Sequence, residues 1–186
     1  MSTDEVTYLH GQNCKVLLVY NGITGTTIGE GYDGGRADAR NSIRAAQALG
    51  VPAGVVMVAD IEDPNFPGAE WYQGWADAMQ ASPYAGSGGF YGNVNDTRFT
   101  DPYCAAAQAD VNVQNALLWG DQPQIGCTSA AGAPTFDPAP APCPMPITPD
   151  IWQYQDGPDT CFTLLPGATG MVDEDEPDSA AYAVMW

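Results

Sequence analysis

The sequence predicts an α/β fold of about six mainly parallel strands with flanking helices. Short apolar runs that suit strands buried on both faces alternate with segments of helical spacing. Helices that separate buried strands imply parallel strands joined by right-handed crossovers, in either a doubly wound sheet or a barrel. The chain has 186 residues, enough for one core. We therefore expect residues 1–186 to form a single domain.

The first strand and helix have clear boundaries. Residues 15–20 read K-V-L-L-V-Y, which predicts a buried strand, and the glycine-rich residues 22–35 predict a loop. Residues 36–49 have apolar side chains at helical spacing and are followed by a glycine and a proline, which predicts an amphipathic helix. Its outer stripe carries three basic side chains, Arg36, Arg40 and Arg44.

The alternation continues through the middle of the chain. Residues 55–59 predict a second buried strand, residues 69–79 a helix and residues 88–92 a short third strand. We expect Thr100-Asp101-Pro102 to supply the N-cap of the next helix, with Pro102 at the first helical position.

The last third is less regular. Residues 116–119 predict a fourth strand, and residues 151–154 and 170–172 are candidates for the fifth and sixth. Between them, residues 120–150 are rich in proline, alanine and glycine, and we interpret them as an ordered insertion or lid. The acid-rich residues 172–178 are interpreted as a solvated charge run.

The charge balance excludes some partners. The chain has five basic and 23 acidic residues, which gives a net charge of −18. This charge would repel nucleic acid and anionic membrane surfaces. No apolar run approaches the ~20 residues that span a bilayer, and no export signal is visible at the start. The sequence therefore predicts neither a nucleic-acid nor a membrane partner.

The cysteines suggest no cofactor. There are five, without C-x-x-C spacing and with a single histidine, so we expect no structural metal site. Cys127 and Cys143 flank the proline-rich loop, and a disulfide between them is one possibility that the spacing leaves open. A redox or metal protein is a minor alternative.

Asp60 and Glu62 are the first candidates for chemistry. They lie two residues apart at the carboxyl end of a predicted buried strand, so their side chains should point the same way. Active sites of parallel barrels form at that end, and paired carboxylates can cleave glycosidic bonds. Alternatively, the two acids only cap the following helix.

The order of several motifs resembles a known group of proteins. A-D-I-E-D-P after a buried strand is followed by W-Y-Q-G-W, G-F-Y-G, W-Q-Y and a closing V-D. This order is similar to that of the glycoside hydrolase family 25 lysozymes. It resembles more closely the related glycoside-hydrolase-like family of unknown function 1906, whose helix pattern D-A-x-x-x-x-x-A-A-x-x-L-G-x-P matches residues 38–52. The resemblance covers roughly residues 15–175.

The resemblance implies an incomplete or distorted TIM-type (β/α) barrel with a glycan-facing groove. It assigns catalytic positions to three acids, Asp60, Glu62 as the general acid, and Asp173. It assigns groove-lining positions to Tyr91, Trp152 and Gln153. For Trp152, ordinary core packing is the alternative.

One departure from the family favours lost catalysis. The family begins with two further strands, the first ending in a catalytic acid, and this chain begins at what would be the third. We therefore expect a catalytically impaired module that acts as a binding or structural subunit, for instance of a phage virion, at bacterial cell-wall glycans. The alternative is an active peptidoglycan hydrolase. A protein partner or a second copy could cover the open barrel edge, and contact with the wall would place the chain on a virion or outside the cell.

Overall fold

The computed structural model describes residues 1–122, 134–155 and 173–186. Its helices are α1 (Thr3–Gly11), α2 (Gly25–Gly29), α3 (Tyr32–Leu49), α4 (Ala69–Gln80), α5 (Thr97–Ala109), α6 (Val111–Gln114) and α8 (Ser179–Ala183). Its strands are β1 (Leu18–Tyr20), β2 (Met57–Asp60), β3 (Gly89–Asn93), β4 (Leu117–Asp121), β5 (Ile151–Gln155) and β6 (Glu174–Pro177). The first five strands lie where the sequence predicts them, within a few residues.

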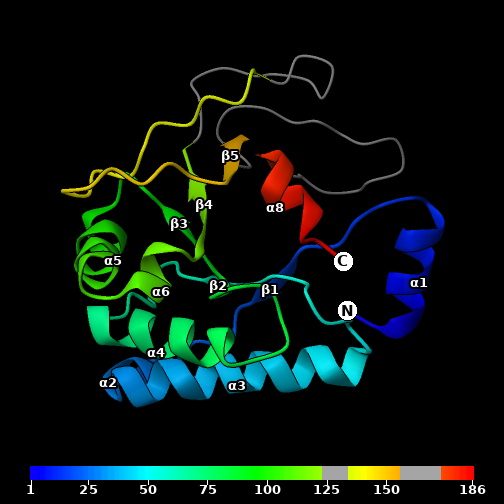
Figure 1. Cartoon of the computed structure of the whole chain (residues 1–186), viewed down its shortest axis with the longest axis horizontal. Coiled ribbons are helices and arrows are strands. Elements are labelled where there is room, and N and C mark those ends of the chain that lie inside the picture. The colour runs from blue at the N-terminus through cyan, green and yellow to red at the C-terminus, as the bar shows by residue number, and fades with distance from the viewer. Residues whose placement is uncertain (123–133, 156–172) are drawn as a thin grey trace.

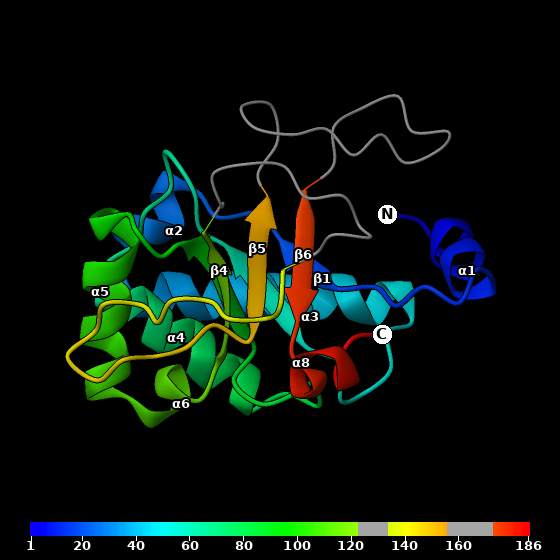
Figure 2. The same ribbon diagram turned by 90° about the horizontal axis from the view of Figure 1, so that it is seen from above.

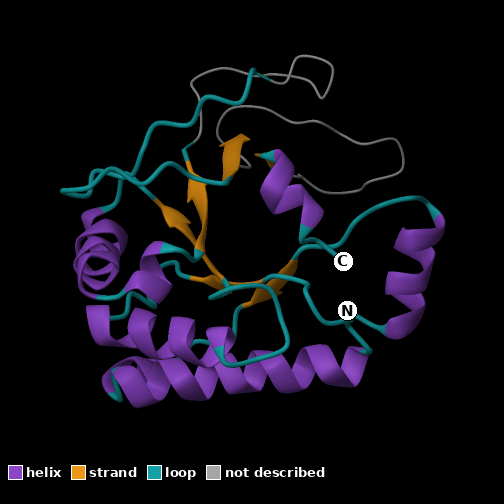
Figure 3. Cartoon of the chain, viewed as in Figure 1, coloured by secondary structure: helices purple, strands orange, loops and turns teal. Residues whose placement is uncertain are grey.

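The strands form one sheet in sequential order, from β1 to β6. β1 to β5 pair in parallel, whereas β6 pairs antiparallel with β5. The sheet curls into a half-barrel, with α3, α4 and α5 on its convex side (Figures 1 and 3). The incomplete barrel is thus confirmed, and parallel pairing holds for the first five strands only.

β6 is formed by residues that were not predicted to be a strand, because it lies in the acid-rich run. Residues 170–172, the predicted candidate, lie outside the described residues. Pairing with β5 gives backbone hydrogen bonds to this run. Because side chains alternate along a strand, Asp175 points to one face of the sheet and its neighbour Glu176 to the other. The prediction of a merely solvated charge run is therefore corrected.

The predicted glycine-rich loop also contains helical structure. The Thr24 hydroxyl accepts a hydrogen bond from the backbone N–H of Thr27, and the Thr27 hydroxyl accepts from the backbone N–H of Thr24. This reciprocal capping starts α2. α3 then begins at Tyr32, four residues earlier than the periodicity predicts. Its first turns include Gly34 and Gly35, which lie against the backbone of Thr27 and of Trp71.

Close approach of α3 and α4 builds the core on the convex side of the sheet. A β-carbon on Gly35 would collide with the Trp71 carbonyl, and one on Gly74 would collide with the Tyr32 carbonyl. Trp71 and Trp75 of α4 are fully buried and stacked, with ring centroids 5.7 Å apart. The two helices therefore pack backbone against backbone.

A buried carboxylate ties α3 to the strand and helix beside it. Asp38 is 1% exposed and accepts hydrogen bonds from the Tyr20 hydroxyl at 3.0 Å and from Trp71 Nε1 at 3.1 Å. Buried polar groups are costly unless they are paired, so this arrangement fixes the rotation of α3 against β1 and α4.

The start of α5 corrects the predicted cap. The N-cap is Asp96, whose carboxylate accepts from the backbone N–H of Arg98 at 2.9 Å, and Pro102 lies inside the helix. Thr100 is a helical residue, and its hydroxyl donates to the Asp96 carbonyl at 3.1 Å. The helix starts earlier than predicted because the Asp96 carboxylate satisfies a free N–H group of the first turn.

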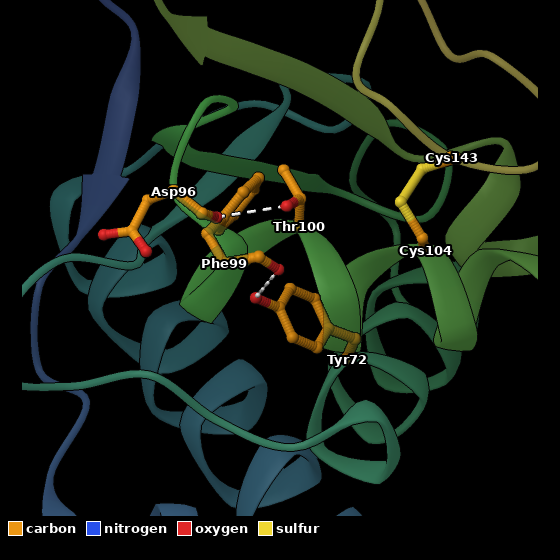
Figure 4. Close-up of a disulfide and its surroundings, with 6 residues drawn as sticks. All are labelled: Tyr72, Asp96, Phe99, Thr100, Cys104 and Cys143. Atoms are coloured by element: carbon orange, nitrogen blue, oxygen red, sulfur yellow. Dashed lines mark hydrogen bonds between the residues drawn. A yellow bond between two sulfur atoms is a disulfide. The ribbon is translucent and has the colours of Figure 1, made fainter.

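A disulfide joins Cys143 to Cys104 of α5, and the two cysteines are 39 positions apart in sequence (Figure 4). The possible pairing of Cys143 with Cys127 is therefore wrong, and Cys127 lies outside the described residues. The described part of the predicted insertion runs past α5, where Ala141 bridges to Ile147 (Figures 1 and 2). The disulfide fastens this extended segment to the convex side of the half-barrel.

The C-terminal end of the chain pairs with its N-terminal half. Val16 and Trp186 exchange two backbone hydrogen bonds of 2.8 and 3.0 Å, and the backbone N–H of Val56 donates to the Val184 carbonyl at 2.8 Å. α1 stands apart from the sheet in both views (Figures 1 and 2). Among the described residues, none of the helices combines the length and hydropathy needed to cross a bilayer.

Candidate functional site

The concave face of the sheet carries the polar and aromatic residues that alternate with the core. Met57, Ala59 and Phe90 belong to the core under the helices. Because side chains alternate between faces along a strand, Asp60 and Tyr91 point to the other, concave face. The two are register partners at the carboxyl ends of β2 and β3.

Trp119 continues this row on β4. It is the register partner of Tyr91, and the two ring centroids are 4.6 Å apart. Both side chains are half-buried. The adjoining strands thus present a pair of aromatic rings on the concave face.

A second row holds the acids of β4 and β6. Asp121 pairs in register with Gln153 of β5, and Gln153 pairs with Asp175 of β6. Asp175 Oδ1 accepts a hydrogen bond from Trp119 Nε1 at 2.7 Å. This bond connects the acidic row to the aromatic pair.

Asp60 gives up its proton at a higher pH than an ordinary aspartate. Burial raises the pKa of its carboxyl from 3.8 to about 6, and repulsion from Glu62 contributes less. Its Oδ1 is buried and has no hydrogen-bond partner among the residues that the structure describes. A carboxyl group in this state can either donate or accept a proton.

The pKa of the Asp175 carboxyl group is also raised. Burial raises its pKa to about 7, with repulsion from Asp173 and Asp121 adding to the rise and the hydrogen bond from Trp119 opposing it. The residue as a whole is nevertheless exposed. The raised pKa therefore reflects the protein atoms around the carboxyl group rather than its complete removal from water, and the hydrogen bond from Trp119 holds this group beside the aromatic pair.

Tyr91 is the residue that the acids surround. Burial raises the pKa of its hydroxyl well above its ordinary range, and repulsion from four carboxylates raises it further. In order of effect, these belong to Asp121, Glu62, Asp60 and Asp175. The Tyr91 hydroxyl therefore remains protonated and able to donate a hydrogen bond amid the acids.

The sequence matches the model of one protein family. The family model described as Rv2525c-like, glycoside hydrolase-like domain matches residues 1–141. The chain belongs to this family. No curated protein matches the sequence.

Solved structures share the fold of this Rv2525c-like domain. An uncharacterized B. stearothermophilus protein is 26% identical, with a TM-score of 0.81 over 100% of this chain and 80% of that one. The Mycobacterium tuberculosis Tat-secreted protein Rv2525c, solved with L-tartrate, is 18% identical, with a TM-score of 0.56 over 95% of this chain and 74% of that one. A second form, solved with HEPES, has a TM-score of 0.53 at 18% identity over 94% and 72%.

The structure brings most of the sequence-predicted site residues of this glycoside-hydrolase-like domain together. Asp60 and Tyr91 are register partners, and Glu62 lies exposed in the loop after β2 while acting electrostatically on both. Gln153 is buried on the same row as the β4 and β6 acids. Asp173 is exposed immediately before β6 and acts on Asp175.

Trp152 is the exception. Alternation along β5 turns it away from the face that Gln153 occupies, and its indole N–H donates to the Gln122 carbonyl at 3.2 Å. It is 3% exposed and its ring lies 5.8 Å from that of Tyr154. Its placement fits packing rather than contact with the Tyr91 and Trp119 pair.

Three residues of the site were not identified from the sequence: Trp119, Asp121 and Asp175. The predicted fourth strand ends at residue 119, whereas β4 continues to Asp121. Two-residue spacing at a strand end, the signal that identifies Asp60 and Glu62, would also have found Trp119 and Asp121. Asp175 gives no such signal because it lies within a run of acids.

Proposed function

We propose that this domain is a glycan-binding module with impaired hydrolytic activity, acting as a binding or structural subunit at bacterial cell-wall glycans. The observation that carries the proposal is the Tyr91 and Trp119 pair, half-buried on the concave face with a carboxylate hydrogen-bonded to Trp119. Aromatic faces combined with a few fixed polar groups are typical of sites for organic ligands. Sugars offer both apolar ring faces and hydroxyl donors to such a surface.

Two features support impaired hydrolysis. β1 reads L-V-Y, so no acid from that strand joins the concave face beside Asp60. Glu62 is exposed in a loop, without the burial that prepares a general acid in glycosidases. The acids can still bind sugar hydroxyl groups without completing a catalytic cluster.

A subunit role, including one in a phage virion, is part of the same proposal. Val19 of β1, at one edge of the sheet, keeps 46% of its surface exposed. A strand at an edge offers backbone groups that another chain can pair with. A protein partner or a second copy of this chain would use that edge.

An active peptidoglycan hydrolase is the second candidate. The proximity of Asp60, whose pKa is raised to about 6, and Glu62 favours it. Paired carboxylates with different environments divide the acid and stabilising roles in glycoside cleavage.

Insoluble peptidoglycan distinguishes the two candidates. Sedimentation with the polymer would measure binding, and turbidity would measure hydrolysis, for the wild type, Tyr91→Ala, Glu62→Gln and the exposed-aromatic control Tyr8→Ala. The module proposal requires binding that Tyr91→Ala alone abolishes, without clearing. Clearing that disappears in Glu62→Gln would establish the hydrolase instead, and absence of both binding and clearing would refute both.

A further inference from the structure

A groove beside α3 and α4, on the convex side of the sheet, is lined by two of the few basic side chains. Its volume is about 550 Å³, and α3 and α4 together with the residues after α4 line it. The residues that line it include Tyr32, Arg36, Arg40, Ile43, Asp77 and Pro83. Two of the chain's five basic residues therefore share one groove, although the net charge is −18.

Neither arginine of the groove has its charge neutralised by a described partner. Within residues 1–122, 134–155 and 173–186, the ion pairs all involve Arg98. Arg36 lies over the Tyr32 ring, 5.7 Å from its centroid, and Arg40 is exposed. A guanidinium presents five donors in a rigid fork, so both side chains retain capacity for an anionic ligand.

The one acid that lines the groove is already engaged. Asp77 Oδ2 accepts from the Tyr32 hydroxyl at 2.7 Å, and its Oδ1 accepts from Asn112 Nδ2 at 2.7 Å. Asp110 also acts electrostatically on Tyr32, so the negative charge lies at the Tyr32 end. Arg40, one helical turn further along α3, lies away from that end and is the better placed of the two arginines to receive a carboxylate.

The size and remaining walls of the groove indicate more than a bare ion. A single carboxylate is comparable with one or two water molecules of about 30 Å³ each, a small part of this volume. Ile43, Ala78 and Pro83 supply apolar surface beside the arginines. An occupant that fills the groove needs an acidic group next to apolar groups.

We propose that this groove docks an acidic peptide segment of a partner protein. Carboxylate side chains of the peptide bind Arg36 and Arg40, and a neighbouring apolar side chain packs against Ile43 and Pro83. Arginine clusters recognise acidic motifs through bidentate, charge-assisted hydrogen bonds. The proposal is independent of glycan binding, because α3 and α4, which line the groove, cover the convex side of the sheet, opposite the concave face (Figure 1).

Peptide selection with a matched control tests the proposal. The full chain would be panned against a random library of short peptides, with the variant Arg36→Gln/Arg40→Gln as counter-selection. The enriched peptides would then be labelled, and their affinities measured by fluorescence anisotropy at low and physiological salt. The control is Arg44→Gln, which removes the same charge from α3 outside the groove, where Arg44 bonds only Asn41 among the described residues.

The expected peptides contain glutamate or aspartate beside an apolar residue. Their affinity should fall about tenfold or more in the double variant, weaken with salt and remain unchanged in Arg44→Gln. Circular dichroism would establish that the variants fold, and Arg36→Lys should keep part of the affinity. Enrichment of neutral or basic peptides, equal affinity in the double variant, or no enrichment would overturn the proposal. Competition by inorganic phosphate as strong as that of the free peptide would reduce the groove to a simple anion site and would also overturn it.

Discussion

The indole N–H of Trp119 donates a hydrogen bond of 2.7 Å to Asp175 Oδ1 and so links β4 to β6 across β5. β6 is the antiparallel strand at the end of the sheet, and β5 is the strand that pairs with it among those the structure describes. The bond therefore gives an edge strand a side-chain connection to the aromatic pair of the concave face. It also donates to the ionised form of Asp175, which it favours.

Replacement of Trp119 by phenylalanine should raise the pKa of Asp175 above its value of about 7. An aromatic ring remains at this position, but the indole N–H, whose hydrogen bond opposes the effect of burial on the Asp175 pKa, is lost. A carbon-13 NMR titration of the aspartate carboxyl groups would measure the shift. Trp152→Phe is the control, because the Trp152 indole bonds the Gln122 carbonyl instead. An unchanged or lowered Asp175 pKa in Trp119→Phe would contradict the assigned bond.

Asp60→Asn should stabilise the fold at pH 7 and not at pH 3. The folded-state pKa of Asp60, about 6, lies above the ordinary 3.8, so the folded chain holds the proton more tightly and loses stability as pH rises from about 4 to 6. The full shift corresponds to about 3 kcal/mol, and partial exposure of the carboxyl reduces the expected gain to about 1 kcal/mol.

Urea unfolding at the two pH values would measure the effect of Asp60→Asn. The exposed acid Asp33, changed to asparagine, corrects for the loss of one negative charge. A gain of the same size at pH 3 and pH 7 would show that the carboxyl group of Asp60 does not titrate as described.

The sequence predicts the parallel part of the fold well because each of its strands is a local apolar run. β6 escapes prediction because its residues read E-D-E-P, and only pairing with β5 makes them a strand. The disulfide partner of Cys143 could not be predicted either, because the spacing of Cys104 and Cys143 in the sequence does not show that they are close in space. Asp60 is found because it lies at the end of a predicted strand, and Tyr91 is found through the family resemblance, whereas Asp175 becomes part of the site only through β6.

Gly35→Ala should destabilise the fold by at least about 2 kcal/mol. The added methyl group meets the backbone of Trp71 and Trp75, which cannot move without separating α3 from α4. Thermal unfolding would measure the loss. In Gly29→Ala, at the end of α2, the new β-carbon has nothing within 4 Å, so that variant should unfold like the wild type. Equal unfolding temperatures for all three proteins would contradict the close helix packing.

Removal of the disulfide by Cys104→Ala/Cys143→Ala should lower the free energy of unfolding by about 3 kcal/mol, because the cross-link closes a long loop in the unfolded chain. Hydrogen exchange should become faster over residues 134–150, which the disulfide fastens to α5. Cys14→Ser is the control, because Cys14 is an exposed free thiol. If exchange over residues 134–150 stayed slow in the double variant, backbone bonds such as that from the Ala141 N–H to the Ile147 carbonyl, 2.8 Å, would be sufficient to hold the segment. The disulfide would then act only by restricting the unfolded chain, without positioning the segment. The free energy of unfolding and the hydrogen exchange rates measure these two effects separately.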